Sequence, residues 1–293
     1  MYRDFYGLMR APFEMTPDPT FLVLSDTHRE GLAMLVYAVR ARKGFVVLTG
    51  EVGTGKTTLL HALLGQLEPE MPSAFLFNPR LEPLDFFRVL FDEFGIETSC
   101  RTKAEYLLSL NRFLIDRLKE NRTALLIIDE AQNLSPEMLE EVRLLSNLET
   151  PTSKLLQIML VGQPELDAML DRPDLRQLRQ RVVLRHHLRP FDEGELSGYV
   201  EERLRLAGYT GKGIFKRAAL RRLYEVTRGV PRLVNVLCDG ALLSGYTREQ
   251  TSLDASTIDD VARELRLVEA APNGQRTTLS PSPRRRSWLG LFR

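Results

Sequence analysis

Residues 45–57 read Phe45-Val46-Val47-Leu48-Thr49-Gly50-Glu51-Val52-Gly53-Thr54-Gly55-Lys56-Thr57, an apolar run that leads into a glycine-rich turn. The apolar run predicts a buried strand, and a helical pattern over Lys56 to Leu67 follows the turn. The last eight residues match G-x-x-x-x-G-K-[ST], the pattern of a phosphate-binding loop. In such a loop the glycines let backbone N–H groups surround phosphates, and the following helix adds positive potential at its N-terminus.

The loop residues have specific expected roles. Lys56 would reach the β- and γ-phosphates of ATP, and the Thr57 hydroxyl would bind Mg²⁺. Thr58 is included in the segment, although packing suits it better than a role as a second ligand. The expected nucleotide-binding loop comprises Gly50, Glu51, Val52, Gly53, Thr54, Gly55, Lys56, Thr57 and Thr58. The competing interpretation is a glycine-rich helix cap with a solvated lysine.

An acidic pair, Asp129-Glu130, closes the apolar run Ala124 to Ile128. Parallel sheets bind ligands at the carboxyl ends of their strands, so this pair is expected beside the phosphate-binding loop. Asp129 would hold Mg²⁺, and Glu130 would polarise the attacking water. Without the loop upstream, such a pair would indicate only a helix cap or a solvated loop. With it, the pair predicts hydrolysis of ATP to ADP and phosphate rather than the transfer reaction of a nucleotide kinase.

Apolar runs alternate with helical patterns along the first two thirds of the chain, which predicts an α/β fold. We expect each strand to be apolar on both faces, and hence a parallel five-stranded sheet sandwiched by helices. The first residues, before a predicted helix over Asp26 to Arg42, are rich in Pro, Gly and aromatics and are expected to be loop-like. The five expected strands are Phe45–Thr49, Ser73–Phe77, Ala124–Ile128, Leu155–Val161 and Val182–Leu188.

After Pro190 no further strand pattern occurs, and four helical segments predict a small all-helical domain. These segments are Glu193–Leu206, Phe215–Thr227, Pro231–Gly245 and Ser256–Leu267. Beyond them, Pro, Ser, Thr and Arg dominate, a composition typical of disorder. We therefore expect an N-terminal segment (1–40), a nucleotide-binding domain (41–190), a helical lid (191–268) and a basic tail (269–293).

The charge balance of 40 Lys and Arg against 39 Asp and Glu conceals an uneven distribution. Five of the 40 basic residues follow the last acid, Glu269, so the rest of the chain carries 35 basic and 39 acidic residues. A mildly acidic body argues against a dedicated nucleic-acid binder. No apolar run approaches the roughly 18 residues that a membrane span needs, and the N-terminus does not resemble a secretory signal, so a cytoplasmic protein is expected.

Taken together, the motifs resemble the AAA+ ATPases, and within them the ExeA/GspA type associated with the general secretion pathway. The resemblance covers most of residues 1 to 268. It rests on Phe5-Tyr6-Gly7-Leu8, Pro12-Phe13, Thr16-Pro17-Asp18-Pro19, the phosphate-binding loop, Asp129-Glu130-Ala131-Gln132, Gly162-Gln163-Pro164-Glu165-Leu166, Leu178-Arg179-Gln180-Arg181 and Gly229-Val230-Pro231-Arg232-Leu233-Val234-Asn235.

The resemblance implies further site residues. Gln163 falls where AAA+ proteins place a polar sensor of the γ-phosphate, although it could simply cap a strand. Arg181 resembles the arginine finger that enters a neighbouring subunit's site, with Arg176 and Arg179 as alternatives. A finger acting in trans would make the enzyme an oligomer. Arg232 resembles the lid arginine called sensor 2, which would contact the nucleotide from the helical lid, or else it forms an ion pair within the lid.

The sequence does not decide the roles of the Pro12-Phe13 region and of His28. The Pro12-Phe13 region either lines the adenine pocket, as the resemblance implies, or belongs to the core. His28 begins a helix and has no identifiable partner, and the pair His186-His187 is not expected to bind a metal because successive residues of a strand face opposite sides.

The resemblance also implies a function and a location. Longer relatives continue through a membrane helix into a peptidoglycan-binding region, and neither segment occurs within these residues. The basic tail, with apolar residues after Arg284-Arg285-Arg286, would either dock on a membrane or partner, at the inner face of the membrane, or remain solvated. We expect a Mg²⁺-dependent ATPase that remodels a secretion, pilus or polysaccharide-export assembly. The alternative is an ATP-switched DNA-binding regulator of the transposition-helper type.

Overall fold

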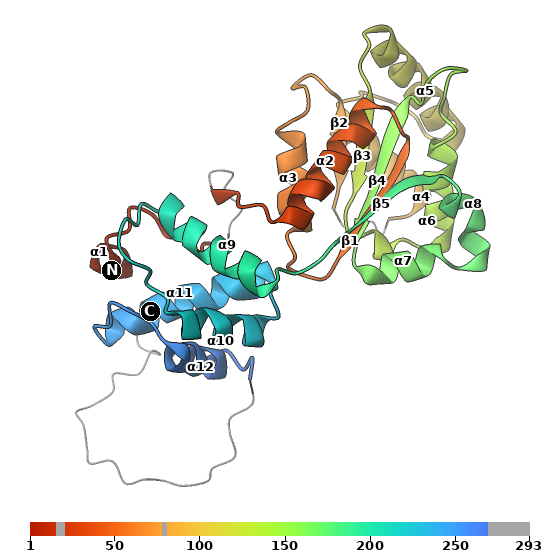
Figure 1. The fold of residues 1–293 in the computed structure, drawn as a ribbon. Coiled ribbons are helices and arrows are strands. Elements are labelled where there is room, and N and C mark those ends of the chain that lie inside the picture. The colour runs from red at the N-terminus through yellow and green to blue at the C-terminus, as the bar shows by residue number, and fades with distance from the viewer. Residues whose placement is uncertain (16–20, 78–80, 269–293) are drawn as a thin grey trace.

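Residues 1–15, 21–77 and 81–268 are described by the computed structural model, and they form a layered α/β body and a helical body (Figure 1). The predicted tail docking concerns residues that lie outside these ranges. Within these ranges, no helix combines the length and the apolar character needed to cross a bilayer.

The α/β body is built on five parallel strands in the order β2-β3-β4-β1-β5. This sheet confirms the predicted fold class, and its strands differ from the expected ranges by a residue at most at either end. Their bounds are β1 (Phe45–Gly50), β2 (Ser73–Leu76), β3 (Ala124–Ile128), β4 (Leu156–Gly162) and β5 (Val182–Leu188).

Helices cover both faces of the sheet (Figure 1). Alternate residues of a strand face opposite sides, so Val46 and Leu48 pack in one apolar layer and Val47 packs in the other. The Val46 face is covered by α2 (Asp26–Arg40) and α3 (Lys56–Leu64). The other face is covered by α4 (Pro83–Glu93), α5 (Lys103–Lys119), α6 (Pro136–Leu145), α7 (Pro164–Leu170) and α8 (Arg176–Arg179), with short 3₁₀ turns at Ala131–Asn133 and Pro173–Leu175.

Strand β5 departs from the expectation that every strand is apolar on both faces. Arg185 and His187 are exposed, whereas Leu188 at the strand's end is buried. The strand lies at the edge of the sheet, beside β1 alone. An edge strand is not fully covered by helices, so alternate side chains meet solvent and polar residues are accepted there.

The helical body contains the four helices expected after Pro190. Side-chain caps define two of their starts: Asp192 and Glu195 form a capping box at α9, and the Asp254 carboxylate accepts from Ser256 N–H at 3.1 Å at α12. The helices are α9 (Glu193–Leu206), α10 (Arg217–Thr227), α11 (Pro231–Thr247) and α12 (Ala255–Glu264).

The start of the chain packs with this helical lid and not with the sheet (Figure 1). The expected loop-like opening is wrong for Tyr2–Tyr6, which form the helix α1 against α11. The Tyr6 hydroxyl donates to the Gln250 carbonyl at 2.8 Å. Phe13 is buried and meets the Phe215 ring edge to face at 6.2 Å, so this aromatic belongs to the lid core.

Candidate nucleotide-binding site

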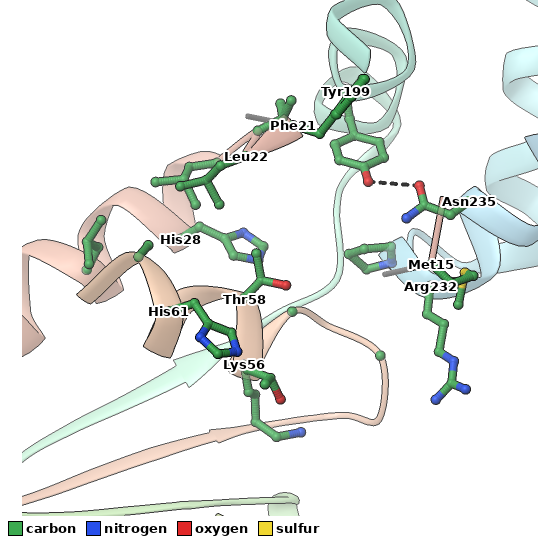
Figure 2. A pocket seen from close by; sticks show the side chains of 18 of the residues that line it. Met15, Phe21, Leu22, His28, Lys56, Thr58, His61, Tyr199, Arg232 and Asn235 are labelled. Carbon is green, nitrogen blue, oxygen red and sulfur yellow. Dashed lines mark hydrogen bonds between the residues drawn. The ribbon is translucent and has the colours of Figure 1, made fainter. Parts of the chain in front are cut away.

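A cavity of about 950 Å³ opens between the sheet and the lid. Figure 2 shows many of the side chains that line it, which come from residues before and within α2, from the phosphate-binding loop and α3, and from α9 and α11. A cavity of this size suits a small-molecule ligand as large as a nucleotide. Pro12 and Phe13 are not among the lining residues, whereas Met15, Phe21 and Leu22 are.

The loop between β1 and α3 adopts the conformation that its glycines allow. Gly53 and Gly55 have φ values of 81° and 98°, a region that is costly for residues with a side chain. Lys56 is buried, and its ammonium donates to the carbonyls of Gly50 at 2.7 Å and Glu51 at 3.1 Å. Burial lowers the pKa of Lys56, and the nearby carboxylates oppose that shift. The amine therefore sits at the mouth of the loop, where it can meet an anionic ligand.

The acidic pair lies at the carboxyl end of β3, on the same edge of the sheet as the loop. Asp129 is 7% exposed, and this burial raises its pKa. Its carboxylate accepts from the Glu130 N–H at 2.9 Å. Glu130 has a φ of 52°, a left-handed backbone conformation that is uncommon for residues with a side chain. Glu130 lines the cavity, which allows the two acids to act on different groups.

Two amide side chains hold the Glu130 carboxylate. Its Oε2 accepts from Gln132 Nε2 at 2.6 Å and from Gln163 Nε2 at 3.2 Å. Gln163 follows β4 and lies beside the acidic residue, and its expected role as a sensor of the γ-phosphate stays a prediction. The backbone N–H of Gln163 also donates to Gln132 Oε1 at 3.1 Å.

The lid reaches the loop through the first turn of α11. The N–H of Arg232 donates to the Gly53 carbonyl at 3.2 Å. A Cβ at Gly53 would lie only 2.8 Å from Arg232 Cβ, so the loop and the first turn of α11 are in close contact at this glycine. The exposed Arg232 side chain extends along the cavity in Figure 2.

Comparison with known proteins identifies the α/β body. Residues 39–170 match the family model described as an AAA domain. The chain is an AAA+ protein. It is 43% identical over 266 residues to general secretion pathway protein A of Aeromonas hydrophila, a match over 90% of this chain and 48% of that protein. The predicted resemblance is thereby confirmed, and the chain spans about half the length of this relative.

Solved structures share the fold of this AAA+ protein at low sequence identity. The ORC2 protein of Aeropyrum pernix, in ADPNP and ADP complexes, has a TM-score of 0.61 and 18% identity, over 87% of this chain and 71% of that one. Drosophila ORC bound to DNA gives a TM-score of 0.65 and 17% identity, over 90% and 66% of the two chains. The Thermotoga maritima RuvB branch migration motor gives 0.55 and 17%, over 87% and 74%.

The three arginines proposed as fingers are not among the residues that line the cavity of this AAA+ protein. Arg181 lies between α8 and β5 and donates to Asn147 Oδ1 at 2.9 Å. Arg179 lies 3.8 Å from Asp171, and Arg176 is exposed. The role of any of them as a finger that acts in a neighbouring subunit stays a prediction.

Sequence reasoning missed several residues around the cavity of this AAA+ protein. It assigned no role to Gln132, although that residue lies within a quoted motif. Tyr199 and Asn235 form a 2.8 Å hydrogen bond across the lid side of the cavity (Figure 2). His28, for which the sequence offered no identifiable partner, has two. Two local signals were available, the amide two residues after the acidic pair and the serine three residues before His28, whereas the contacts of His28 with Thr54 and of Tyr199 with Asn235 join distant parts of the chain.

The donors near the loop fit a magnesium ion. Thr57 is the second residue of α3, is exposed, and lines the cavity. Asp129 and Glu130, directly after β3, supply carboxylate oxygens close enough to Lys56 to influence its pKa. Magnesium prefers hydroxyl, carboxylate and phosphate oxygens, so Thr57 and Asp129 are the residues that would hold it.

Proposed function

We propose that this AAA+ protein binds ATP with Mg²⁺ in the cavity and hydrolyses it to ADP and phosphate. The observation that carries the proposal is the Glu130 carboxylate, which lines the cavity and is oriented by two amides. A nucleotide-binding protein that only transferred phosphate to another substrate would not need a carboxylate to activate water.

The proposed chemistry divides the work among a few side chains. Lys56 exchanges its two carbonyl partners for phosphate oxygens, a change favoured by its burial. Glu130 orients a water and accepts its proton, and Gln163 keeps the carboxylate directed toward the cavity. Magnesium, when bound through Thr57 and Asp129, supplies charge neutralisation on the phosphates.

Turnover of purified variants tests this proposal. Glu130→Gln should retain ATP binding while kcat falls by about 10² to 10⁴, the contribution of a general base. Lys56→Ala should lose binding. Glu137→Gln, an exposed acid in the first turn of α6, is the matched control and should leave both quantities unchanged. Full ATPase activity in Glu130→Gln would refute the assignment.

We propose further that hydrolysis remodels a membrane-associated assembly of secretion or export. The relative named general secretion pathway protein A supports this role. Pull-down from envelope fractions with Glu130→Gln, in the presence of ATP, tests it: enrichment of membrane-associated export proteins over the Lys56→Ala control is expected. Salt-sensitive DNA binding that requires ATP, with no such enrichment, would instead favour a DNA-binding regulator.

A further inference from the structure

His28 is a buried, titratable side chain in the cavity wall that the proposed chemistry does not use. It lies in the first turn of α2 and is only 4% exposed. Its ring contacts Ser25, the loop residue Thr54, and the ring of Phe191 at a centroid distance of 5.8 Å. A polar side chain buried this deeply is expected to have a hydrogen-bonding role.

The hydrogen bonds define which nitrogen carries the proton. Nε2 lies 2.9 Å from the Thr54 carbonyl, which can only accept, so Nε2 must donate. Nδ1 lies 2.6 Å from Ser25 Oγ, and in a neutral ring it accepts the hydroxyl proton. Burial lowers the pKa of His28, which favours this neutral form. A directed chain therefore runs from the Ser25 hydroxyl through the imidazole to the loop carbonyl.

The bond to Thr54 determines how one peptide of the loop is turned. Every peptide bond among the described residues is trans, so the Thr54 carbonyl and the Gly55 N–H point in opposite directions. When the carbonyl is held by His28, the Gly55 N–H must point away from the imidazole. The preceding peptide is held separately, because Thr54 N–H donates to the Glu51 carbonyl at 3.3 Å.

Steric contacts show that His28 is seated directly against the loop. A Cβ at Gly55 would lie 2.9 Å from His28 Nε2, and Gly55 has a φ of 98°. The left-handed glycine therefore permits the approach of the ring as well as the turn itself.

We propose that His28 is a positioning residue for nucleotide binding, one that turns the Thr54–Gly55 peptide so that the Gly55 N–H is presented to a phosphate. The inference rests on the proposed function for its ligand. It concerns a residue outside the loop and the acidic pair, and it assigns a binding role to the start of α2.

Two substitutions at His28 test the hydrogen bonds of Nδ1 and Nε2 separately. Glutamine places a donor where Nε2 lies and should preserve the bond to Thr54. Asparagine is shorter, can still accept from Ser25, and cannot reach Thr54. The full chain carrying His28→Gln or His28→Asn is titrated with a fluorescent ATP analogue and, in competition, with ATP and Mg²⁺. Urea unfolding without nucleotide records the stability of each variant.

We expect His28→Asn to weaken ATP binding about tenfold, the effect of one lost hydrogen bond, and His28→Gln to remain within about threefold of the wild type. Equal loss in both variants would overturn the proposal, as would unchanged affinity in His28→Asn. If His28→Asn does not fold, Ser25→Ala replaces it: weaker ATP binding would support the directed chain and unchanged binding would overturn it.

The outcome is independent of catalysis. Binding is measured directly, so a wild type that binds ATP without hydrolysing it would refute the proposed hydrolysis while leaving the role of His28 testable. Lys56→Ala defines the signal without specific binding. A wild type with no more affinity than Lys56→Ala would refute the proposed function first, and with it this inference.

Discussion

Arg203 is a buried residue whose guanidinium donates to three backbone carbonyls. It is 8% exposed and donates to the carbonyls of Pro12 at 2.6 Å, Phe21 at 3.0 Å and Glu14 at 3.3 Å. The same guanidinium lies over the Phe21 ring at 5.0 Å from its centroid. One side chain of α9 thereby ties the start of the chain to the lid and shapes the cavity wall.

Removing that side chain should cost stability. We expect Arg203→Ala to lower the free energy of unfolding by about 3 kcal/mol, because three carbonyls lose their donor in a buried place. Urea denaturation followed by circular dichroism measures the change. Arg205→Ala is the matched control, since Arg205 is exposed and pairs with Glu202 on the surface, and the free energy of unfolding of this variant should stay within about 0.5 kcal/mol of the wild type. Equal losses in the two variants would contradict the structural role of Arg203.

At the scale of residues, the sequence predicts those site residues that stand within a recognisable local pattern. Lys56 and Glu130 were found because the strand, turn and acid that position them adjoin them in sequence. Arg203 could not be assigned because its carbonyl partners lie 182 to 191 residues away, and the contact of His28 with the loop could not be foreseen because Thr54 lies 26 residues away. Such contacts depend on how elements pack, which periodicity does not report.

At the scale of elements, the turn between α10 and α11 shows how closely the lid is joined to the sheet. Gly229 has a φ of 76°, and its carbonyl accepts from the Phe191 N–H at 2.9 Å. A Cβ at this position would lie 1.9 Å from the Phe191 carbonyl oxygen. Phe191 lies in the short segment that joins β5 to α9. The glycine therefore allows the turn to pack directly against this segment.

Gly229→Ala should therefore disturb the lid far more than backbone strain alone would. We expect a loss of about 3 kcal/mol or more from strain and backbone clash together. Gly95→Ala provides the control, because Gly95 has a φ of 64° and nothing within 4 Å of the added methyl, and should cost about 1 kcal/mol. Thermal and urea unfolding compare the two. A Gly229→Ala variant as stable as Gly95→Ala would contradict this expectation, because it would show that the backbone around Phe191 moves aside at little cost in free energy.

Elements were predictable where an apolar pattern was long or buried. The three central strands and the helices of the lid follow from periodicity, since burial selects their residues. The short helix α1 was missed because five residues give too little periodicity to distinguish it from a loop. The polar alternation in β5 was overlooked because edge position is a property of the sheet and not of the strand.

At the scale of the whole molecule, the cavity exists because two bodies meet. The Arg232 N–H reaches the Gly53 carbonyl at 3.2 Å, across 179 positions of sequence, and residues before α2 complete the wall. The motifs indicated that both bodies bind one nucleotide, since Lys56 and Arg232 were assigned to the same ligand. Their relative placement needed the structure, because no local pattern specifies which turn of α11 rests on the loop.

The position of the arginine cluster makes assembly testable. Arg176, Arg179 and Arg181 are absent from the residues lining the cavity of their own chain. An arginine from this cluster would therefore act on a neighbour's nucleotide, and each active site would combine Glu130 of one copy with an arginine of the next. A variant lacking Glu130 and a variant lacking the finger then carry complementary defects.

Mixing inactive variants should restore activity if the finger acts in trans. Glu130→Gln is combined in turn with Arg176→Ala, Arg179→Ala and Arg181→Ala under conditions of subunit exchange, and phosphate release is measured. With random exchange of equal amounts, about one quarter of the sites regain both groups, because each group is intact with a probability of about one half. Arg181→Ala is expected to be inactive alone and to recover in the mixture, whereas an arginine with no catalytic role leaves its own variant active. An inactive Arg181→Ala variant that gains nothing from mixing would contradict action in trans.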